Sequence, residues 1–205
     1  MILAVVGSGG KTTLIKKCAG HYMKQGLKVF VTTSTHMAAE KDALFTDDAG
    51  LIIGELEKKR YVMAGMREKE KMRALPETVY KKVCTHADVV LIEADGSNRK
   101  PIKYPAEYEP VIYDNVDKII VVCGLWAIGM RAGDAAHRIG LVKKCLDIED
   151  DTIITAGHIQ KLVSEGYVKP LRKKYPDKEI EIYPSHDGSL QQRSIAEKII
   201  LGGFI

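Results

Sequence analysis

The sequence predicts an α/β fold in which a mostly parallel sheet is flanked by helices. Three short apolar runs carry this prediction, at residues 2–6, 89–92 and 119–123. They lack the polar alternation of a half-exposed strand, and therefore suit strands that are buried on both faces of a sheet. The stretches between these runs are long enough for the helical crossovers that join parallel strands.

The composition of the 205 residues indicates a globular protein with a sizeable core, because hydrophobic residues make up 45% and charged residues 28% of the chain. We expect a single domain, residues 1–205, with a small insertion at about residues 45–70 as one option. The formal charge of +4 is too weak to indicate nucleic acid, and no apolar stretch is long enough to cross a membrane. Four widely spaced cysteines without metal-ligand spacing are typical of a reduced, cytoplasmic protein.

The first predicted strand is followed by a helix and a second strand. From Thr12, apolar residues recur at helical spacing as far as Met23, which predicts an amphipathic helix. Gly26 favours the end of this helix, because glycine readily adopts the left-handed conformation that terminates helices. Residues 29–33 are apolar and β-branched, and predict the second strand.

The middle of the chain has a less regular pattern. Residues 51–54 and 60–64 are short apolar runs, which predict either a hairpin or strands at a sheet edge. Residues 68–87 predict a mostly helical segment that Pro76 interrupts, since proline lacks the N–H that a helix interior needs.

The C-terminal part predicts three helices and one strand. Asp134 is a plausible N-cap of a helix that runs to about residue 146, and Thr155 opens another helix. A late strand is expected at residues 179–183. Ser189, followed by Gln192, resembles a capping box before the last helix.

The segment after the first predicted strand has the composition of a phosphate-binding loop. It consists of Gly7, Ser8, Gly9, Gly10, Lys11, Thr12 and Thr13. A strand, a glycine-rich turn and a helix point backbone N–H groups and the positive end of the helix at phosphate oxygens. In such a loop, Lys11 contacts the outer phosphates and Thr12 offers its hydroxyl to magnesium. We therefore predict a nucleoside triphosphate, ATP or GTP, and Mg²⁺ as the ligands of this loop.

The loop is shorter than the G-x-x-x-x-G-K-[ST] pattern, because Val5 stands where the first glycine belongs. It resembles the shortened phosphate loop of the Mur ligase type, in which ATP is still bound. The fold prediction is therefore P-loop NTPase-like with a short phosphate loop. The alternative is a tight turn between strand and helix with an incidental lysine.

Two carboxylates, Glu93 and Asp95, follow the apolar run at residues 89–92, as expected of a Walker B strand beside the strand of the phosphate loop. Magnesium takes such oxygens together with a threonine hydroxyl, water and phosphate. We predict Thr12, Glu93 and Asp95 as metal ligands, and Lys11, Glu93 and Asp95 as catalytic residues. Side chains alternate in direction along a strand, so one carboxylate is expected to face the metal and the other to lie farther away. The alternative is that Asp95 belongs to an ordinary turn that follows a buried strand.

Two further residues are predicted to contact the nucleotide. Thr33 ends the second predicted strand, at the edge of the sheet where open α/β proteins bind ligands, or it simply leads into a capped turn. Lys103 lies with Arg99 and Lys100 after the acidic strand end, where such cations close over phosphates or hold an anionic second substrate. Solvated surface lysines are the alternative, and for residues 137–138 we favour a structural or surface role.

Several motifs together resemble the YqeC family. They are residues 7–13, TTSTHM at residues 32–37, EADGS at residues 93–97, PAEYEPVI at residues 105–112, residues 124–129, residues 134 and 137–138, and residues 153–162. The resemblance implies an α/β nucleotide-binding fold. It also implies a role in the maturation of a selenium-dependent molybdenum hydroxylase, with that enzyme or its maturation factors as partners.

These observations together predict a cytoplasmic, magnesium-dependent ATPase or GTPase whose cycle serves maturation of a molybdenum hydroxylase. ATP is favoured over GTP, because the sequence contains no Asn-Lys-x-Asp motif for reading guanine. Two other classes stay open. An ATP-dependent phosphotransferase or ligase would act on a small anionic substrate, and a non-hydrolytic delivery chaperone would use the nucleotide only to switch its affinity for a partner.

Overall fold

The computed structural model describes residues 1–69 and 71–185 of the chain. The chain forms two compact units, each built from several segments. The first unit contains Met1–Val5, Thr12–Gly96 and Val111–Lys118. The second unit contains Val6–Lys11, Ser97–Pro110 and the described residues from Ile119 onward. The predicted phosphate loop is therefore divided, since Lys11 belongs to the second unit and Thr12 to the first.

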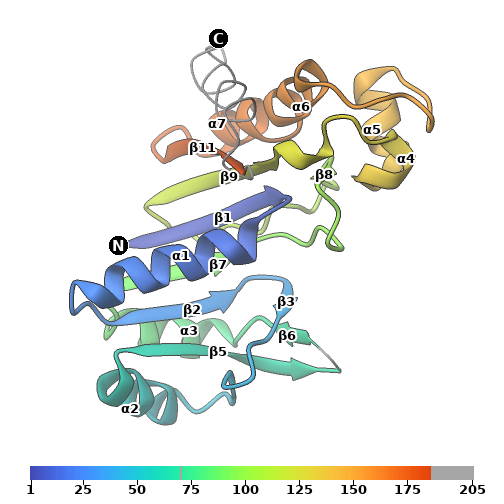
Figure 1. Cartoon of the computed structure of the whole chain (residues 1–205). Helices are drawn as coiled ribbons and strands as arrows, with labels where there is room; N and C mark the ends of the chain where they lie inside the picture. The colour runs from blue at the N-terminus through green and yellow to red at the C-terminus, as the bar shows by residue number, and fades with distance from the viewer. Residues whose placement is uncertain (70, 186–205) are drawn as a thin grey trace. The chain divides into compact units, whose positions relative to one another are not determined.

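A mostly parallel sheet forms the centre of the first unit (Figure 1). Its strands are β1 (Ile2–Ser8), β2 (Val29–Thr33), β3 (His36–Ala38), β4 (Leu44–Phe45), β5 (Tyr61–Glu68), β6 (Lys71–Arg73) and β7 (Val89–Glu93). They are ordered β1-β7-β2-β5-β6-β3, and β4 pairs with β5. Strands β1, β7, β2, β5 and β4 are parallel, whereas β6 is antiparallel to both of its neighbours. Every residue of β2 and β7 is buried, and for β7 this was predicted from the apolar run at residues 89–92.

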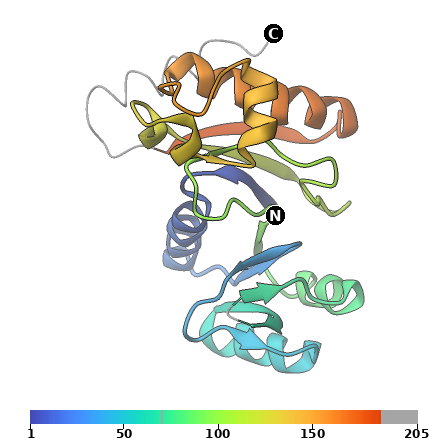
Figure 2. The same cartoon turned by 90° about the vertical axis from the view of Figure 1, so that its right-hand side faces the viewer.

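Three helices flank this sheet. They are α1 (Lys11–Lys24), α2 (Ala49–Lys59) and α3 (Glu77–Cys84). Figures 1 and 2 show α1 and α3 on opposite faces of the strands. Helix α1 buries Leu14, Ile15 and Ala19, which follow the helical spacing read from the sequence. The predicted stop is confirmed, because α1 ends just before Gly26, whose φ of 76° is left-handed.

The middle region differs from its prediction. Residues 51–54 lie inside helix α2, whose N-cap Asp48 accepts hydrogen bonds from the N–H groups of Gly50 and Leu51. The hairpin prediction is therefore wrong, and residues 61–64 instead begin β5, a strand parallel to β2. Residues 71–73 form β6, so only the part after Pro76 is helical. Apolar runs this short fit a strand and one turn of a buried helix equally well.

The second unit combines short strands with a group of helices. It contains β8 (Ile102–Lys103), β9 (Lys118–Gly124), β10 (Ala136–His137), β11 (Glu179–Ser185), η1 (Leu125–Ala127), α4 (Ala132–Ala135), α5 (Ile139–Leu146), α6 (Ala156–Val163), η2 (Ser164–Val168) and α7 (Lys169–Lys174). The strand order is β11-β9-β1, where the end of β1 is the part that belongs to this unit. Strands β8 and β10 form a separate parallel pair.

Two helix predictions in this unit have opposite outcomes. The helix expected from Asp134 to residue 146 is interrupted, because Asp134 lies inside α4 and the chain then forms β10 before α5 begins. Arg138 makes this break with a left-handed φ of 59°. The Thr155 prediction is confirmed, since its side chain caps α6 and forms a capping box with His158. The capping box predicted at Ser189 lies outside the described residues.

The predicted fold class is thus confirmed as a mixed α/β structure with mostly parallel strands and flanking helices. Among the helices of the described residues, none is both long and apolar enough to cross a membrane.

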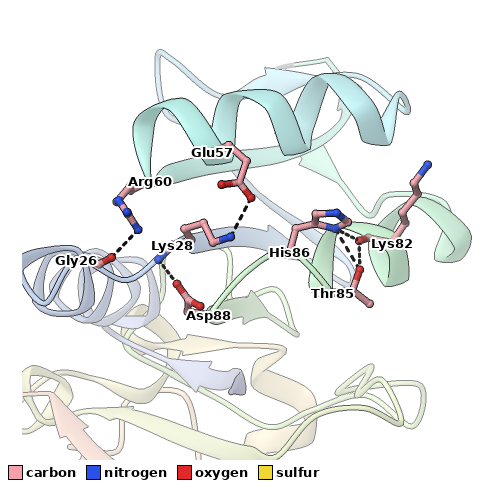
Figure 3. A network of polar contacts seen from close by, with 8 residues as sticks. All are labelled: Gly26, Lys28, Glu57, Arg60, Lys82, Thr85, His86 and Asp88. Atoms are coloured by element: carbon pink, nitrogen blue, oxygen red, sulfur yellow. Dashed lines mark hydrogen bonds and ion pairs between the residues drawn. The ribbon is translucent and has the colours of Figure 1, made fainter.

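Polar contacts link the amino ends of three parallel strands in the first unit (Figure 3). The backbone N–H of Lys28, just before β2, donates to Oδ2 of Asp88 at 2.7 Å, and Asp88 immediately precedes β7. The Lys28 ammonium donates to Glu57 at 2.8 Å, and the Arg60 guanidinium donates to the carbonyl of Gly26 at 2.8 Å. These bonds fix where β2, β5 and β7 begin, at the end of the sheet away from Thr33 and Glu93.

We expect Asp88→Ala to lower the free energy of unfolding by about 1 kcal/mol, because the Lys28 N–H loses a charged acceptor at an exposed site. Chemical denaturation followed by circular dichroism measures this change. Asp88→Asn keeps an acceptor oxygen and should lose less. Equal losses in the two variants would contradict a role for this hydrogen bond.

Candidate functional site

In the predicted phosphate loop, both the backbone conformation and the lack of room for a Cβ atom require glycine. Gly7, Gly9 and Gly10 have φ values of 92°, 77° and 147°, which side chains rarely tolerate. A Cβ atom on Gly7 would lie 2.1 Å from the carbonyl oxygen of Val122. On Gly9, it would lie 2.5 Å from Cα of Gly124. Within the second unit, the loop therefore packs backbone against backbone.

Two polar side chains of the loop bind backbone carbonyls in the same unit. Ser8 Oγ donates to the carbonyl of Pro101 at 3.1 Å, and Lys11 Nζ donates to the carbonyl of Gly7 at 2.7 Å. Both residues are buried, at 3% exposure each. The lysine ammonium is thus folded back over its own loop, at the first residue of α1. Loop glycines, a lysine and the amino end of a 14-residue helix are the groups that hold phosphate oxygens.

The first unit brings a hydroxyl and a carboxylate together. Thr12 Oγ1 donates to Oε2 of Glu93 at 3.2 Å. Glu93 ends β7, the strand directly beside β1, where it is the register partner of Val5. The predicted adjacency of the acidic strand and the loop strand is therefore confirmed. Asp95 follows two residues later and is fully buried.

The donor chemistry of this pair fits magnesium, which prefers carboxylate and hydroxyl oxygens. Thr12 and Glu93 supply one of each within hydrogen-bonding distance. In the described part of the chain, no group of three or more His, Cys, Asp or Glu residues could hold a metal ion. Magnesium at Thr12 and Glu93 would therefore take most of its ligands from phosphate and water, as it does in nucleotide sites.

Thr33 and Thr13 occupy different environments. The Thr33 hydroxyl is buried, donates to the carbonyl of Glu93 at 2.7 Å and accepts the N–H of Thr35 at 3.1 Å. It thereby joins the end of β2 to the end of β7. Thr13 lies on α1 and is exposed. Of the two, Thr33 stabilises the strand ends near Glu93 rather than presenting a free hydroxyl.

Lys103 lies in a buried ion-pair cluster of the second unit. Its Nζ donates to Oε2 of Glu109 at 2.9 Å, and the guanidinium of Arg138 donates to the same oxygen. The Lys103 side chain has 0% exposure and that of Glu109 has 6%. Burial alone would raise the pKa of Glu109, but the hydrogen bonds from Arg138 and Lys103 outweigh burial, so this pKa is lowered.

Glu109 was missed as a functional candidate. It stands between two prolines in a stretch without strand or helix periodicity, and its partner Arg138 is 29 positions away. Lys100 was considered either as a phosphate or substrate contact or as a surface lysine, and a structural or surface role was favoured for Arg138. The structure places the Lys100 ammonium 2.5 Å from the carbonyl of Asp134, and the Arg138 guanidinium on a buried carboxylate. Glu107 lies two residues from Glu109, so the sequence does not single out the carboxylate that binds these cations.

The chain resembles known proteins over most of its length. The model of the YqeC protein family matches residues 3–140. The chain is 30% identical over 149 residues to "Uncharacterized protein YqeC" of Escherichia coli (strain K12), which covers 67% of this chain and 57% of that protein. The chain therefore spans only somewhat more than half the length of that relative. No solved structure matches the chain significantly. On the family match and this identity, the chain belongs to the YqeC family.

Proposed function

We propose that this protein binds a nucleoside triphosphate with magnesium, through a P-loop-like fold with a short phosphate loop, and hydrolyses it. The conformation of the loop is the observation that supports this most. Gly7, near the end of the buried strand β1, and Gly9 and Gly10, which follow the strand, have left-handed φ values, and a lysine at the first turn of a long helix lies back on Gly7. A tight turn with an incidental lysine needs neither the glycine packing nor the buried ammonium.

In the proposed mechanism, the loop N–H groups and Lys11 hold the outer phosphates and stabilise the charge that develops there. Lys11 must first leave the carbonyl of Gly7. Thr12 and Glu93 would hold magnesium, since their hydroxyl and carboxylate oxygens lie within hydrogen-bonding distance of each other. Magnesium at this position would neutralise phosphate charge. Either Glu93 or Asp95 then orients the attacking water.

ATP is the favoured nucleotide, because the chain carries no guanine-reading motif. We further propose a cytoplasmic location and a role in maturing a selenium-dependent molybdenum hydroxylase, which follows from the family resemblance of the sequence motifs. A phosphotransferase or ligase is the second candidate. The cluster of Lys103, Arg138 and His137 favours it, since these residues suit an anionic second substrate.

Binding is measurable through the single tryptophan of the chain, Trp126. Its Nε1 lies 3.0 Å from the position of a Cβ on Gly124, and Gly124 packs against Gly9 of the loop. Trp126 fluorescence during titration with ATP or GTP, with and without Mg²⁺, reports nucleotide binding. No response to either nucleotide, confirmed by calorimetry, would contradict the proposal.

We expect Thr12→Val to weaken ATP binding in the presence of Mg²⁺ by roughly 10- to 100-fold, because the metal loses a ligand. Metal-free binding should change little, since the loop and Lys11 are intact. Thr12→Ser keeps the hydroxyl and serves as the matched control. If Thr12→Val and Thr12→Ser bound Mg-ATP equally well, Thr12 would not be a metal ligand.

Nucleotide turnover separates the three classes of function. Phosphate release from purified protein with ATP and Mg²⁺ supports hydrolysis, and ADP formation that appears only after addition of cell extract supports a phosphotransferase or ligase. Tight binding without phosphate release or ADP formation in either condition supports a nucleotide-switched chaperone.

A further inference from the structure

The phosphate loop and the end of strand β9 are packed together within the second unit. Gly9, which follows β1, contacts Gly124, which ends the neighbouring strand β9. A Cβ atom on Gly124 would lie 2.9 Å from Cα of Gly9 and 2.9 Å from the carbonyl oxygen of Pro101. Open α/β proteins bind ligands beyond the carboxyl ends of neighbouring strands. The turn that follows β9 therefore borders the proposed nucleotide site.

Trp126 lies at this border. Its Nε1 is 3.0 Å from the position of a Cβ on Gly124, and Cα of Gly9 is 2.9 Å from the same position. One edge of the indole is therefore next to the backbone of the phosphate loop. All of these residues belong to the second unit, so their mutual placement does not depend on the first unit.

The short helix η1 presents Trp126 to solvent. Leu125 and Ala127, on either side of it in the sequence, are both fully buried, whereas Trp126 is 46% exposed. The N–H of Ile128 donates to the carbonyl of Leu125 at 3.0 Å and closes the turn. Packing of the two neighbours and this hydrogen bond thus hold the helix in place. An indole that served only the core would be buried as its neighbours are.

An exposed indole beside a phosphate loop has the chemistry of a nucleobase contact. One ribose joins the base of a nucleotide to its phosphates, so the base must be held by residues close to the loop. Aromatic side chains stack on nucleobases, and every base offers a π-face for this contact. Covering the indole with a base also removes apolar surface from water. The position of Trp126 therefore favours ligand binding over packing as its role.

We propose that Trp126 stacks on the base of the nucleotide whose phosphates bind the loop of Gly7, Gly9 and Gly10. This inference rests on the proposed function and names its base contact. Stacking reads no hydrogen-bond pattern, so Trp126 adds affinity for ATP and GTP alike. It favours purines, because two fused rings cover more of the indole than the single ring of a pyrimidine. The choice between ATP and GTP is then made by other residues.

The test compares ATP with inorganic tripolyphosphate, which has a chain of three phosphates but no base. Calorimetric titration in the presence of Mg²⁺ measures the affinity of each ligand for the unmodified protein and for Trp126→Ala. We expect Trp126→Ala to weaken ATP binding roughly 10- to 100-fold, because the stacking contact is lost. Its affinity for tripolyphosphate should be unchanged, and its loss of affinity for CTP should be smaller than for ATP.

Three further variants separate stacking from packing. Trp126→Phe keeps an aromatic face and should retain most of the affinity for ATP. Trp126→Leu keeps apolar bulk without that face, so it should lose as much affinity as Trp126→Ala, and it replaces that variant if alanine prevents folding. Leu141→Ala removes another exposed apolar side chain of the same unit, in helix α5, and should change neither affinity.

The two ligands distinguish a failure of this inference from a failure of the proposed function. Unchanged affinity for ATP in Trp126→Ala would overturn the base contact. Equal losses for ATP and tripolyphosphate would also overturn it, because the effect would then lie on the phosphates or on the loop itself. In both cases, binding of ATP to the unmodified protein leaves the proposed function in place. If neither ligand binds the unmodified protein, the proposed function fails and the base contact fails with it.

Discussion

Lys11→Ala is expected to reduce phosphate release from ATP to background and to weaken ATP binding on the order of 100-fold. In the proposed mechanism the ammonium of Lys11 neutralises the outer phosphates, and alanine leaves no charged group at this position of the loop. The variant also removes a buried cation that donates to the carbonyl of Gly7, so its fold is checked separately. Phosphate release and Trp126 fluorescence measure the two effects.

The matched control is Lys17→Ala, which removes a lysine from an exposed position of the same helix. It should turn over and bind ATP as the unmodified protein does. Equal phosphate release from Lys11→Ala and the unmodified protein would mean that Lys11 has no part in turnover. Circular dichroism and the melting temperature Tm of each variant show whether a loss of activity is a loss of fold.

Gly7→Ala is expected to destabilise the protein by roughly 3 kcal/mol or more, and to abolish ATP binding. The new Cβ would stand 2.1 Å from the carbonyl oxygen of Val122, on a residue whose φ is 92°. Neither atom can move away cheaply, because Val122 belongs to the buried strand β9. Chemical denaturation measures the loss of stability.

Gly20→Ala provides the opposite expectation within helix α1. No atom lies within 4 Å of a Cβ at Gly20, and its backbone is helical. Alanine should therefore stabilise the protein by roughly 0.5–1 kcal/mol and leave ATP binding unchanged. If Gly7→Ala and Gly20→Ala changed the free energy of unfolding equally, the close packing of Gly7 against Val122 would be contradicted.

The elements that could be predicted from the sequence are those whose signal is local. Strands β2, β7 and β9 are built around short apolar runs, and the Thr155 cap with its helix lies within a few consecutive residues. The glycine loop was predicted in the same way. Its neighbour Glu93 was predicted because parallel strands end at the same edge of a sheet.

The elements that could not be predicted depend on distant partners or on unmarked backbone conformations. Arg138 breaks a predicted helix by adopting a left-handed φ without being glycine, and such a position has no sequence signal. Glu109 gains its importance from Lys103 and Arg138, which only the folded chain brings to one oxygen. The Thr33 hydroxyl bonds the carbonyl of Glu93 in the neighbouring strand, and this partner lies 60 positions away in the sequence.

The polar contacts around Lys28 and Asp88 have a consequence for substitutions in this sheet. They hold the starting points of β2 and β7, while Thr33 and Glu93 stand at the far ends of the same two strands. The two ends of β2 and β7 are thereby held by separate sets of hydrogen bonds within one sheet. Substitutions at Lys28 or Asp88 should therefore change stability while the hydrogen bond from Thr33 to the carbonyl of Glu93 stays in place.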